Sequence, residues 1–449
     1  MTAPTAPASK VDLFFARALR PFAPVEARES ISAALLTLTV FLLLMAYYLL
    51  KTAREPLILL QGGAEVKSYA AAGQSLLLLF VVPAYRALAS RVGRMKLLAG
   101  VYGFFALNLL LFAALVSANV PLGVAFYLWV GIFSVTAIAQ FWSFANDLYT
   151  PEQGKRLFAV LGIGSSVGAV AGSFIAKQLA GLGPRAMMLG AAAVLVVCIA
   201  LFAIVDRRER RAHDVHAGSA HDEPPHVEGS LIGFLFRDKY LVLLAALTFL
   251  LNCVNTNGEY ILDRTLLEAV ESGAAGAQDP SAFIGAFKGE FFGWVNVIGV
   301  VLQLFVVSRV LRVIGVRRAL YILPAVAFAS YSVILAAPLL ALIRIGKIAE
   351  NSLDYSVQNT ARQALFLVGT RAEKYVGKTI VDTLMVRLGD VSSAGLVFLA
   401  TQIELPTKAF AALNLGLIGC WLAVVLALGR EHLKRSRQIE DGQQPGPSA

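Results

Sequence analysis

The chain alternates between apolar runs of about twenty residues and short polar links. The first half holds six runs, at residues 31–54, 66–88, 96–117, 121–147, 157–180 and 185–205. The second half holds six more, at residues 238–263, 283–307, 317–336, 338–366, 378–401 and 406–428. About 20 residues of α-helix cross the hydrocarbon core of a bilayer. The pattern therefore predicts an all-α polytopic membrane protein with about twelve transmembrane helices.

The basic residues between the runs predict the topology. Cytoplasmic loops carry an excess of Lys and Arg, so the basic clusters Arg309–Arg318 and Arg430–Arg437 should lie on the same side. Two loops on the same side of a membrane must be separated by an even number of spans. Residues 338–366 must therefore span the membrane, although charged residues lower the hydropathy of that run. We therefore expect a multi-pass protein of the cell inner membrane, with both termini in the cytoplasm.

A short repeat divides the chain into two halves. SRVGRMKLL (Ser90–Leu98) follows the second run, and SRVLRVIGVRRAL (Ser308–Leu320) follows the eighth. Parallel six-helix repeats resemble the layout of the major facilitator superfamily, although Ser90 stands where its loop signature usually has Asp. The expected parts are a cytoplasmic N-terminal segment, a six-helix half, a cytoplasmic linker, a second six-helix half and a cytoplasmic tail, at residues 1–30, 31–205, 206–232, 233–429 and 430–449.

Composition supports this class of protein. Of the 449 residues, 57% are hydrophobic and only 15% are charged, and the mean hydropathy is +0.69. The net charge of +10 reflects the basic loops and does not indicate binding to nucleic acid. Since no nucleophile, acid/base or metal-ligand pattern stands out, we expect no enzyme activity, no cofactor and no metal site. The protein is expected to act as a monomer in the lipid bilayer.

The tenth run carries a stripe of charged and polar residues. Their side chains project within a sector about 80° wide over about 27 Å of helix. The stripe comprises Arg344, Lys347, Asn351, Asp354, Gln358 and Arg362. Charged residues inside a membrane are costly unless they face protein or a wet cavity, so the stripe indicates a transport pathway.

Three other runs carry similar stripes, and we expect all four to surround one cavity. The first run contributes Thr37, Tyr48, Lys51 and Glu55. The fourth contributes Thr136, Gln140, Ser143 and Asp147. The seventh contributes Asn252, Asn255, Thr256, Glu259 and Asp263. In the superfamily that this chain resembles, helices one, four, seven and ten line the central cavity.

The eleventh run carries two pairs of oppositely charged residues. In the eleventh run, Lys378 and Asp382 are spaced for a local ion pair, and so are Arg387 and Asp390. Such pairs either stabilise the fold or hold a charge ready for an anionic substrate.

In the fifth run a row of glycines, spaced every four residues, predicts close packing against another helix. These are Gly164, Gly168 and Gly172.

Three segments resemble the ATP:ADP antiporter family of bacteria and plastids. They are YYLLKTAREPLIL (Tyr47–Leu59), the segment Phe141–Gly172, and the segment Asp354–Asp390. The resemblance implies exchange of ATP for ADP, or of related nucleotides, by alternating access. It also implies that Lys51, Lys378 and Glu290 match residues that the family uses in transport. The eleventh run departs from the family's Gly-Lys-Ser-Gly-like sequence, because it carries Asp390 there.

The sequence thus predicts a secondary transporter for a small anionic substrate such as ATP or ADP. The alternatives are another organic anion or small solute, with or without proton coupling, and a membrane scaffold that transports nothing. The expected substrate-binding residues are Lys51, Arg344, Lys347, Asn351, Arg362 and Lys378. The expected coupling or gating residues are Glu259, Asp263, Glu290, Asp354 and Asp382.

Overall fold

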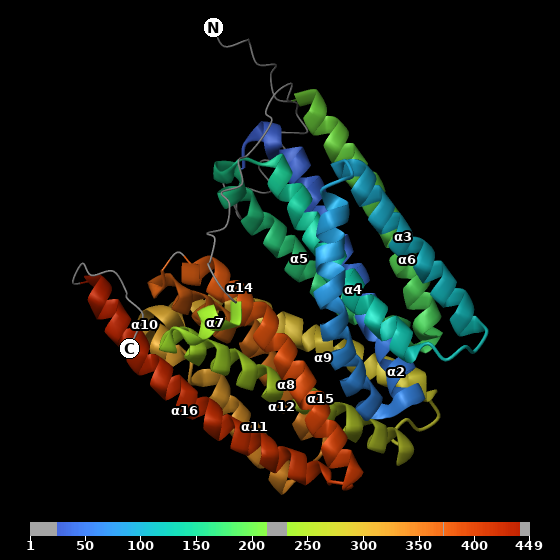
Figure 1. Cartoon of the computed structure of the whole chain (residues 1–449). Helices are drawn as coiled ribbons and strands as arrows, with labels where there is room; N and C mark the ends of the chain where they lie inside the picture. Colours follow the sequence, from blue (N-terminus) through green and yellow to red (C-terminus); the bar gives the residue numbers. More distant parts are fainter. Residues whose placement is uncertain (1–24, 213–230, 371, 441–449) are drawn as a thin grey trace. The chain divides into compact units, whose positions relative to one another are not determined.

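The computed structural model describes residues 25–212, 231–370 and 372–440, and these residues form helices and short connections without a β-strand (Figure 1). The first half contains α2 (Ala27–Ala89), α3 (Arg94–Ser117), α4 (Gly123–Leu148), α5 (Pro151–Leu179) and α6 (Gly183–Ala212). The second half contains α7 (Leu231–Phe236), α8 (Lys239–Glu271), α9 (Pro280–Val301), α10 (Val307–Ala319), α11 (Ile322–Ala336), α12 (Leu340–Leu353), α13 (Asn359–Leu365), α14 (Lys378–Ile380), α15 (Val386–Gln402) and α16 (Thr407–Glu440).

Glycines break the longest helices into membrane-sized pieces. The 63 residues of α2 would extend about 95 Å as one straight helix, about three times the hydrocarbon thickness of a bilayer. Gly63 interrupts α2 with φ 76°, and Gly183 and Gly315 each adopt φ 77° at the start of α6 and within α10. Only glycine adopts this conformation without strain, so each break marks a turn between two expected spans.

The predicted helical runs are confirmed as helices. Among the described residues, eight continuous helices are long and apolar enough to cross a membrane, and two of them, Glu29–Ala89 and Arg156–Glu209, have the length of two spans. The region 340–365 is helical despite its low hydropathy, as its place in the topology requires. It contains a π-helical turn over Asp354–Gln358, and two further π turns, Glu373–Gly377 and Val381–Met385, flank α14.

The chain packs into two compact units, each built from three stretches of the sequence. Unit 1 holds the described residues of Met1–Ile58, Leu78–Gly218 and Gln278–Gly293. Unit 2 holds those of Leu59–Leu77, Ser219–Ala277 and Trp294–Ala449. In unit 1, α3 lies beside α6, and in unit 2, α8 lies beside α16 (Figure 1). The predicted cytoplasmic segments fall outside the described residues at 1–24, 213–230 and 441–449.

The glycine row of α5 packs directly on α2, as predicted. A Cβ atom at Gly168 would lie 2.2 Å from the carbonyl oxygen of Phe41, and one at Gly172 would lie 2.5 Å from that of Met45. Both distances are far below van der Waals contact, and the obstructing atoms belong to the backbone. The two helices therefore approach more closely than any side chain on this face would allow.

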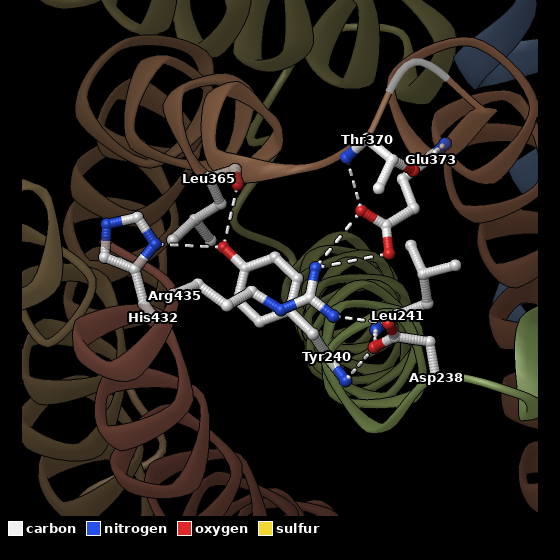
Figure 2. Close-up of polar contacts among 8 residues, drawn as sticks. All are labelled: Asp238, Tyr240, Leu241, Leu365, Thr370, Glu373, His432 and Arg435. Carbon is white, nitrogen blue, oxygen red and sulfur yellow. Dashed lines mark hydrogen bonds and ion pairs between the residues drawn. The ribbon is translucent and has the colours of Figure 1, made fainter. Parts of the chain in front are cut away.

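Arg435 ties three helices of unit 2 together in a buried cluster (Figure 2). It comes from α16, is 2% exposed, and forms an ion pair with Asp238, which precedes α8. Its other guanidinium nitrogen lies 3.1 Å from Glu373, at the start of the eleventh span. Both carboxylates also cap backbone nitrogens: Asp238 accepts from Tyr240, and Glu373 accepts from Thr370. The cluster, Asp238, Glu373 and Arg435, thus fixes three helix ends with one cation.

Unit 1 holds its helices in a similar way. Arg156 of α5 lies 2.8 Å from Glu29 of α2, and the first turn of α5 is closed by a capping box between Thr150 and Gln153. Gln153 also donates to Glu29 at 3.3 Å. In unit 1 the fifth helix thus contacts the first directly, through Arg156 and Glu29, whereas in unit 2 the ends of the corresponding helices are joined through Arg435 of the sixth.

Gly168→Ala should destabilise the protein, because its methyl group would meet the backbone of α2. Gly162→Ala is a matched control on the same helix, where nothing lies within 4 Å of the added Cβ. Since alanine favours an open helix position by about 0.5–1 kcal/mol, the control should be neutral or slightly stabilising. Thermal unfolding of the two variants in detergent measures the difference. Equal melting temperatures would contradict the close packing.

Arg435→Met should lower the free energy of unfolding by about 3–5 kcal/mol, because it leaves two buried carboxylates without their cation. Lys434→Met is the matched control, since that neighbouring side chain is 69% exposed. Its effect should stay within about 0.5 kcal/mol. Adding Asp238→Asn and Glu373→Gln to Arg435→Met should recover most of the loss. No recovery in the triple variant would show that Arg435 acts through packing rather than charge.

Candidate functional site

The polar face of α2 begins a charged cluster in unit 1. Arg54 and Glu55 follow Lys51 by three and four residues, and Glu55 is fully buried. The guanidinium of Arg54 lies 3.1 Å from Glu55 and 4.3 Å from the ring centroid of Tyr127 on α4. Arginine commonly uses both contacts when it is removed from water. This part of α2 is therefore held in place by charge and aromatic contacts together.

Two charged residues of α9 complete this cluster. Lys288 is also fully buried, with its ammonium 3.8 Å from Glu55, and Glu290 lies 3.0 Å from Lys177 of α5. Between them, a Cβ atom at Gly289 would lie 2.7 Å from the backbone nitrogen of Lys177. The glycine thus lets α9 and α5 approach, and this approach brings the two ion pairs together.

Lys51 rests against aromatic rings. Its ammonium lies 4.2 Å from the ring centroid of Phe292 and 5.3 Å from that of Tyr48. The Tyr48 ring also packs edge-on against Tyr47 and Phe292. Aromatic faces stabilise a cation without neutralising it, so these two contacts leave Lys51 positively charged.

The cluster is richer in cations than in carboxylates. We name it the α2/α9 cluster, and it comprises Lys51, Arg54, Glu55, Lys177, Lys288 and Glu290. Four basic residues face two acidic ones in this group. Arginine forks and lysine ammonium groups are the usual protein partners of phosphate and carboxylate oxygens. The arrangement can therefore hold a small polyanion.

A second polar network lies inside unit 2, between α8 and α12. Lys347 is fully buried, and its ammonium donates to the side-chain oxygen of Asn255 at 2.9 Å and lies 3.4 Å from Glu350. A Cβ atom at Gly258 would lie 2.9 Å from the Lys347 ammonium and 2.0 Å from the Tyr331 hydroxyl. Only glycine at this position leaves room for the network.

The predicted stripes of the seventh and tenth runs meet in this network. Asn351 donates to Glu259 at 3.0 Å, and Lys347 reaches Asn255, so α12 and α8 pair along their polar faces. Asp354 begins the π turn that follows α12 and lines a small cavity with Asn255 and Glu350. Lys347 is thus held by protein groups, as expected of a lysine in a structural ion pair.

Other predicted residues bind partners elsewhere in unit 2. Asp263 lies 2.6 Å from Lys67, a residue of the α2 segment that belongs to this unit. Arg362 lies 3.5 Å from Asp382. Arg344 lines an apolar pocket of about 510 Å³ together with Trp294.

Two expected ion pairs of the eleventh run do not form. Asp382 pairs with Arg362 rather than with Lys378, for which the described residues show no hydrogen bond or ion pair. Asp390 accepts hydrogen bonds from the amide of Asn252 and from the hydroxyls of Ser75 and Thr256. Arg387 donates to the hydroxyl of Ser75. The π turn Val381–Met385 changes the angle between Lys378 and Asp382, so the spacing rule for a regular α-helix fails for that pair. Arg387 and Asp390 lie in the regular helix α15 and bond to other residues of unit 2 instead.

Several functional candidates were missed by sequence reasoning. They are Arg54, Lys67, Lys177 and Lys288. Lys177 is the single charged residue of the apolar run 157–180, which was itself a signal, because a charge in such a run requires a partner. Its partner, Glu290, lies far away in the sequence, and so does Glu55, the partner of Lys288, so no spacing rule could identify them.

Sequence comparison places the chain near known nucleotide carriers. It is 23% identical over 351 residues to ADP,ATP carrier protein 1 of Chlamydia trachomatis, and equally to that of Chlamydia muridarum. Each alignment covers 68% of this chain and 64% of the carrier. The chain therefore matches less than two thirds of these relatives' length. The expected resemblance to ATP:ADP carriers is confirmed as a distant similarity.

Solved transporters share the fold. The nucleoside transporter NupG matches with a TM-score of 0.64 and 11% identity, over 90% of this chain and 99% of its own. The POT family transporter PepTSo matches with a TM-score of 0.63 and 12% identity, over 91% and 99%. At these identities the likeness concerns the fold alone. The family model described as Major Facilitator Superfamily matches residues 31–372, so this chain belongs to the Major Facilitator Superfamily and is a multi-pass membrane transporter rather than an enzyme.

Proposed function

We propose that this chain exchanges nucleotides of the ATP and ADP type across the membrane by alternating access. The observation that carries the proposal is the excess of basic side chains in the α2/α9 cluster. Arginine forks and lysine ammonium groups are usual partners of phosphate oxygens. The similarity to chlamydial ADP,ATP carriers supports nucleotides over other anions.

Lys51 is the proposed contact for substrate phosphate. It matches a lysine of the ATP:ADP antiporter family, and the aromatic rings of Tyr48 and Phe292 hold its ammonium. The carboxylates of the cluster, by contrast, already face basic partners: Glu55 faces Arg54 and Lys288, and Glu290 faces Lys177. A polyanion that binds Lys51 therefore meets a cluster whose own negative charge is compensated.

The second candidate is exchange or uptake of another organic anion. Asp390 in the eleventh helix favours this candidate, because it places a carboxylate where the nucleotide carriers have a basic run. In the structure Asp390 accepts hydrogen bonds from Asn252 and Thr256, so its charge is held by unit 2.

Counterflow in proteoliposomes separates the two candidates. Vesicles loaded with unlabelled ADP should take up labelled ATP several times faster than empty vesicles, because exchange needs a counter-substrate. Vesicles without protein provide the background. Equal uptake by loaded and empty vesicles would reject nucleotide exchange, and stimulation by a loaded dicarboxylate or inorganic phosphate alone would favour the second candidate.

Lys51→Gln should reduce ATP counterflow by about 10- to 100-fold, because a contact to a charged group contributes about 1.5–3 kcal/mol. Lys408→Gln is the matched control, since Lys408 lies exposed at the start of α16. Both variants should reach the membrane and melt at the temperature of the unchanged protein. Full counterflow by Lys51→Gln would remove this residue from the substrate site.

A further inference from the structure

A pocket of about 510 Å³ lies between α9 and α12 in unit 2. Its lining is apolar apart from one arginine: Trp294 and Ile298 come from α9, and Arg344, Ile345 and Ile348 come from α12 together with two alanines. Among the described residues that line it, Arg344 alone carries a charge. Pockets that bind small molecules measure roughly 300–1,000 Å³, so this one has room for an organic ligand.

The pocket occupies one face of α12, and other faces of this helix pack against protein. The residues of α12 that line the pocket recur at intervals of three and four, so they share one helix face. On other faces, Lys347 donates to Asn255 of α8, and a Cβ atom at Gly346 would lie 2.1 Å from the Ser330 hydroxyl oxygen of α11. The pocket face carries Ile345 instead, which is 65% exposed. The pocket thus lies on the side that α12 turns away from α8 and α11.

Apolar surface continues beyond the pocket. Trp294 is 45% exposed, and Val301 of α9 and Leu339, directly before α12, are exposed as well. Large exposed apolar surfaces mark interaction sites, and the acyl chains of lipids are as apolar as a leucine side chain. Lipid is therefore the partner that this surface suits in a membrane protein.

Arg344 lies close to the beginning of its helix. Since α12 begins at Leu340, the Cα atom of Arg344 is about 6 Å along the axis from that end. Side chains of an α-helix lean toward its N-terminus, so we expect the guanidinium to reach back in that direction. Residues 337–339 connect two spans, so this end of α12 lies near a membrane surface, where the phosphates of phospholipids are found.

An acidic phospholipid matches the pocket better than a nucleotide does. Its single phosphate fits the single guanidinium, and its acyl chains fit the apolar lining. A zwitterionic phospholipid carries its own cation beside the phosphate, so it gains less from the arginine. A nucleotide polyphosphate carries several negative charges and needs several cations, such as those of the α2/α9 cluster. Basic pockets between transmembrane helices commonly hold the head groups of acidic lipids.

We propose that this pocket binds an acidic phospholipid, with its phosphate on Arg344 and an acyl chain against Trp294 and the isoleucines. The lipid contacts α9 and α12 together, and so it stabilises a contact that Ser352 also makes, by donating to the carbonyl of Val295 at 3.2 Å. Arg344 thus has a lipid, rather than the transported anion, as its partner. This inference goes beyond the proposed exchange of nucleotides and does not depend on it.

Quenching of Trp294 fluorescence by brominated lipids tests the pocket in the purified full-length chain. In detergent micelles, brominated phosphatidylglycerol should half-quench Trp294 at about a tenfold lower mole fraction than brominated phosphatidylcholine, the factor that one hydrogen bond to a charged group contributes. The chain holds four tryptophans, and the part of the signal that Trp294→Phe removes belongs to this residue. Equal quenching by the two lipids would overturn the proposal.

Arg344→Gln should abolish the preference for phosphatidylglycerol, because the amide of glutamine carries no charge. Lys408→Gln is the matched control, since Lys408 is a basic residue at the start of another helix, α16, and does not line the pocket. The control should keep the full preference. A preference that persists in Arg344→Gln would overturn the proposal.

Ala341→Phe gives a second signature if Arg344→Gln does not fold. This variant keeps Arg344 and places a ring in the pocket, at a position that is exposed in the structure. The ring should exclude the acyl chain and so remove the preference for phosphatidylglycerol. An unchanged preference in this variant would place the lipid outside the pocket and overturn the proposal.

Thermal unfolding in micelles measures the same binding independently of fluorescence. A ligand that binds only the folded state raises the melting temperature. Phosphatidylglycerol should therefore raise the melting temperature of the unchanged protein and of Lys408→Gln by more than phosphatidylcholine does, and Arg344→Gln should lose this difference. Equal shifts by the two lipids in the unchanged protein would contradict the proposal.

Competition separates a lipid from other sources of the anion. Unbrominated phosphatidylglycerol should relieve the quenching by its brominated form, whereas inorganic phosphate and ATP should not. Relief by inorganic phosphate would indicate a simple anion site, and relief by ATP would assign the pocket to the nucleotide; either result would overturn the lipid assignment. Because the measurement needs no transport, absence of ATP counterflow would reject the exchange proposal and leave the lipid site standing.

Discussion

The cost of placing charge away from water governs the interior of this transporter. Lys288, Lys347, Glu55 and Asp263 are almost completely buried, yet each lies beside an opposite charge or a polar group that accepts or donates a hydrogen bond. Removing one member of such a pair leaves an uncompensated charge, which costs far more than the pair itself contributes. The positions of the helices are consequently tied to the positions of these charges.

Each packing unit contains a buried ion pair between a residue of the first half of the sequence and a residue of the second half. In unit 1, an acid from the first half of the sequence, Glu55, meets a base from the second half, Lys288. In unit 2, a base from the first half, Lys67, meets an acid from the second half, Asp263. Each unit thus holds one segment of the opposite half through a buried ion pair. Local clusters, such as the one around Arg435, fix the helices that stay within their own half.

Periodicity predicted the helices and part of the site, and its failures have physical causes. The stripes of the seventh and tenth runs meet through Lys347 and Asn351 because an apolar environment forces polar faces together. The Lys378–Asp382 pair failed because π turns interrupt the regular helix. The pairing of Glu55 with Lys288 could not be predicted, since it depends on how distant helices pack rather than on local spacing.

The polar character of α12 has a consequence for how the protein reaches its membrane. The helix Leu340–Leu353 carries Arg344, Lys347 and Glu350 within 14 residues. Charged residues make partitioning of a helix into lipid unfavourable during synthesis. Two residues of this helix, Lys347 and Asn351, find polar partners on α8, which is translated earlier. Biogenesis of the second half should accordingly be ordered: α8 must remain close to the insertion machinery until α12 emerges and the two integrate together.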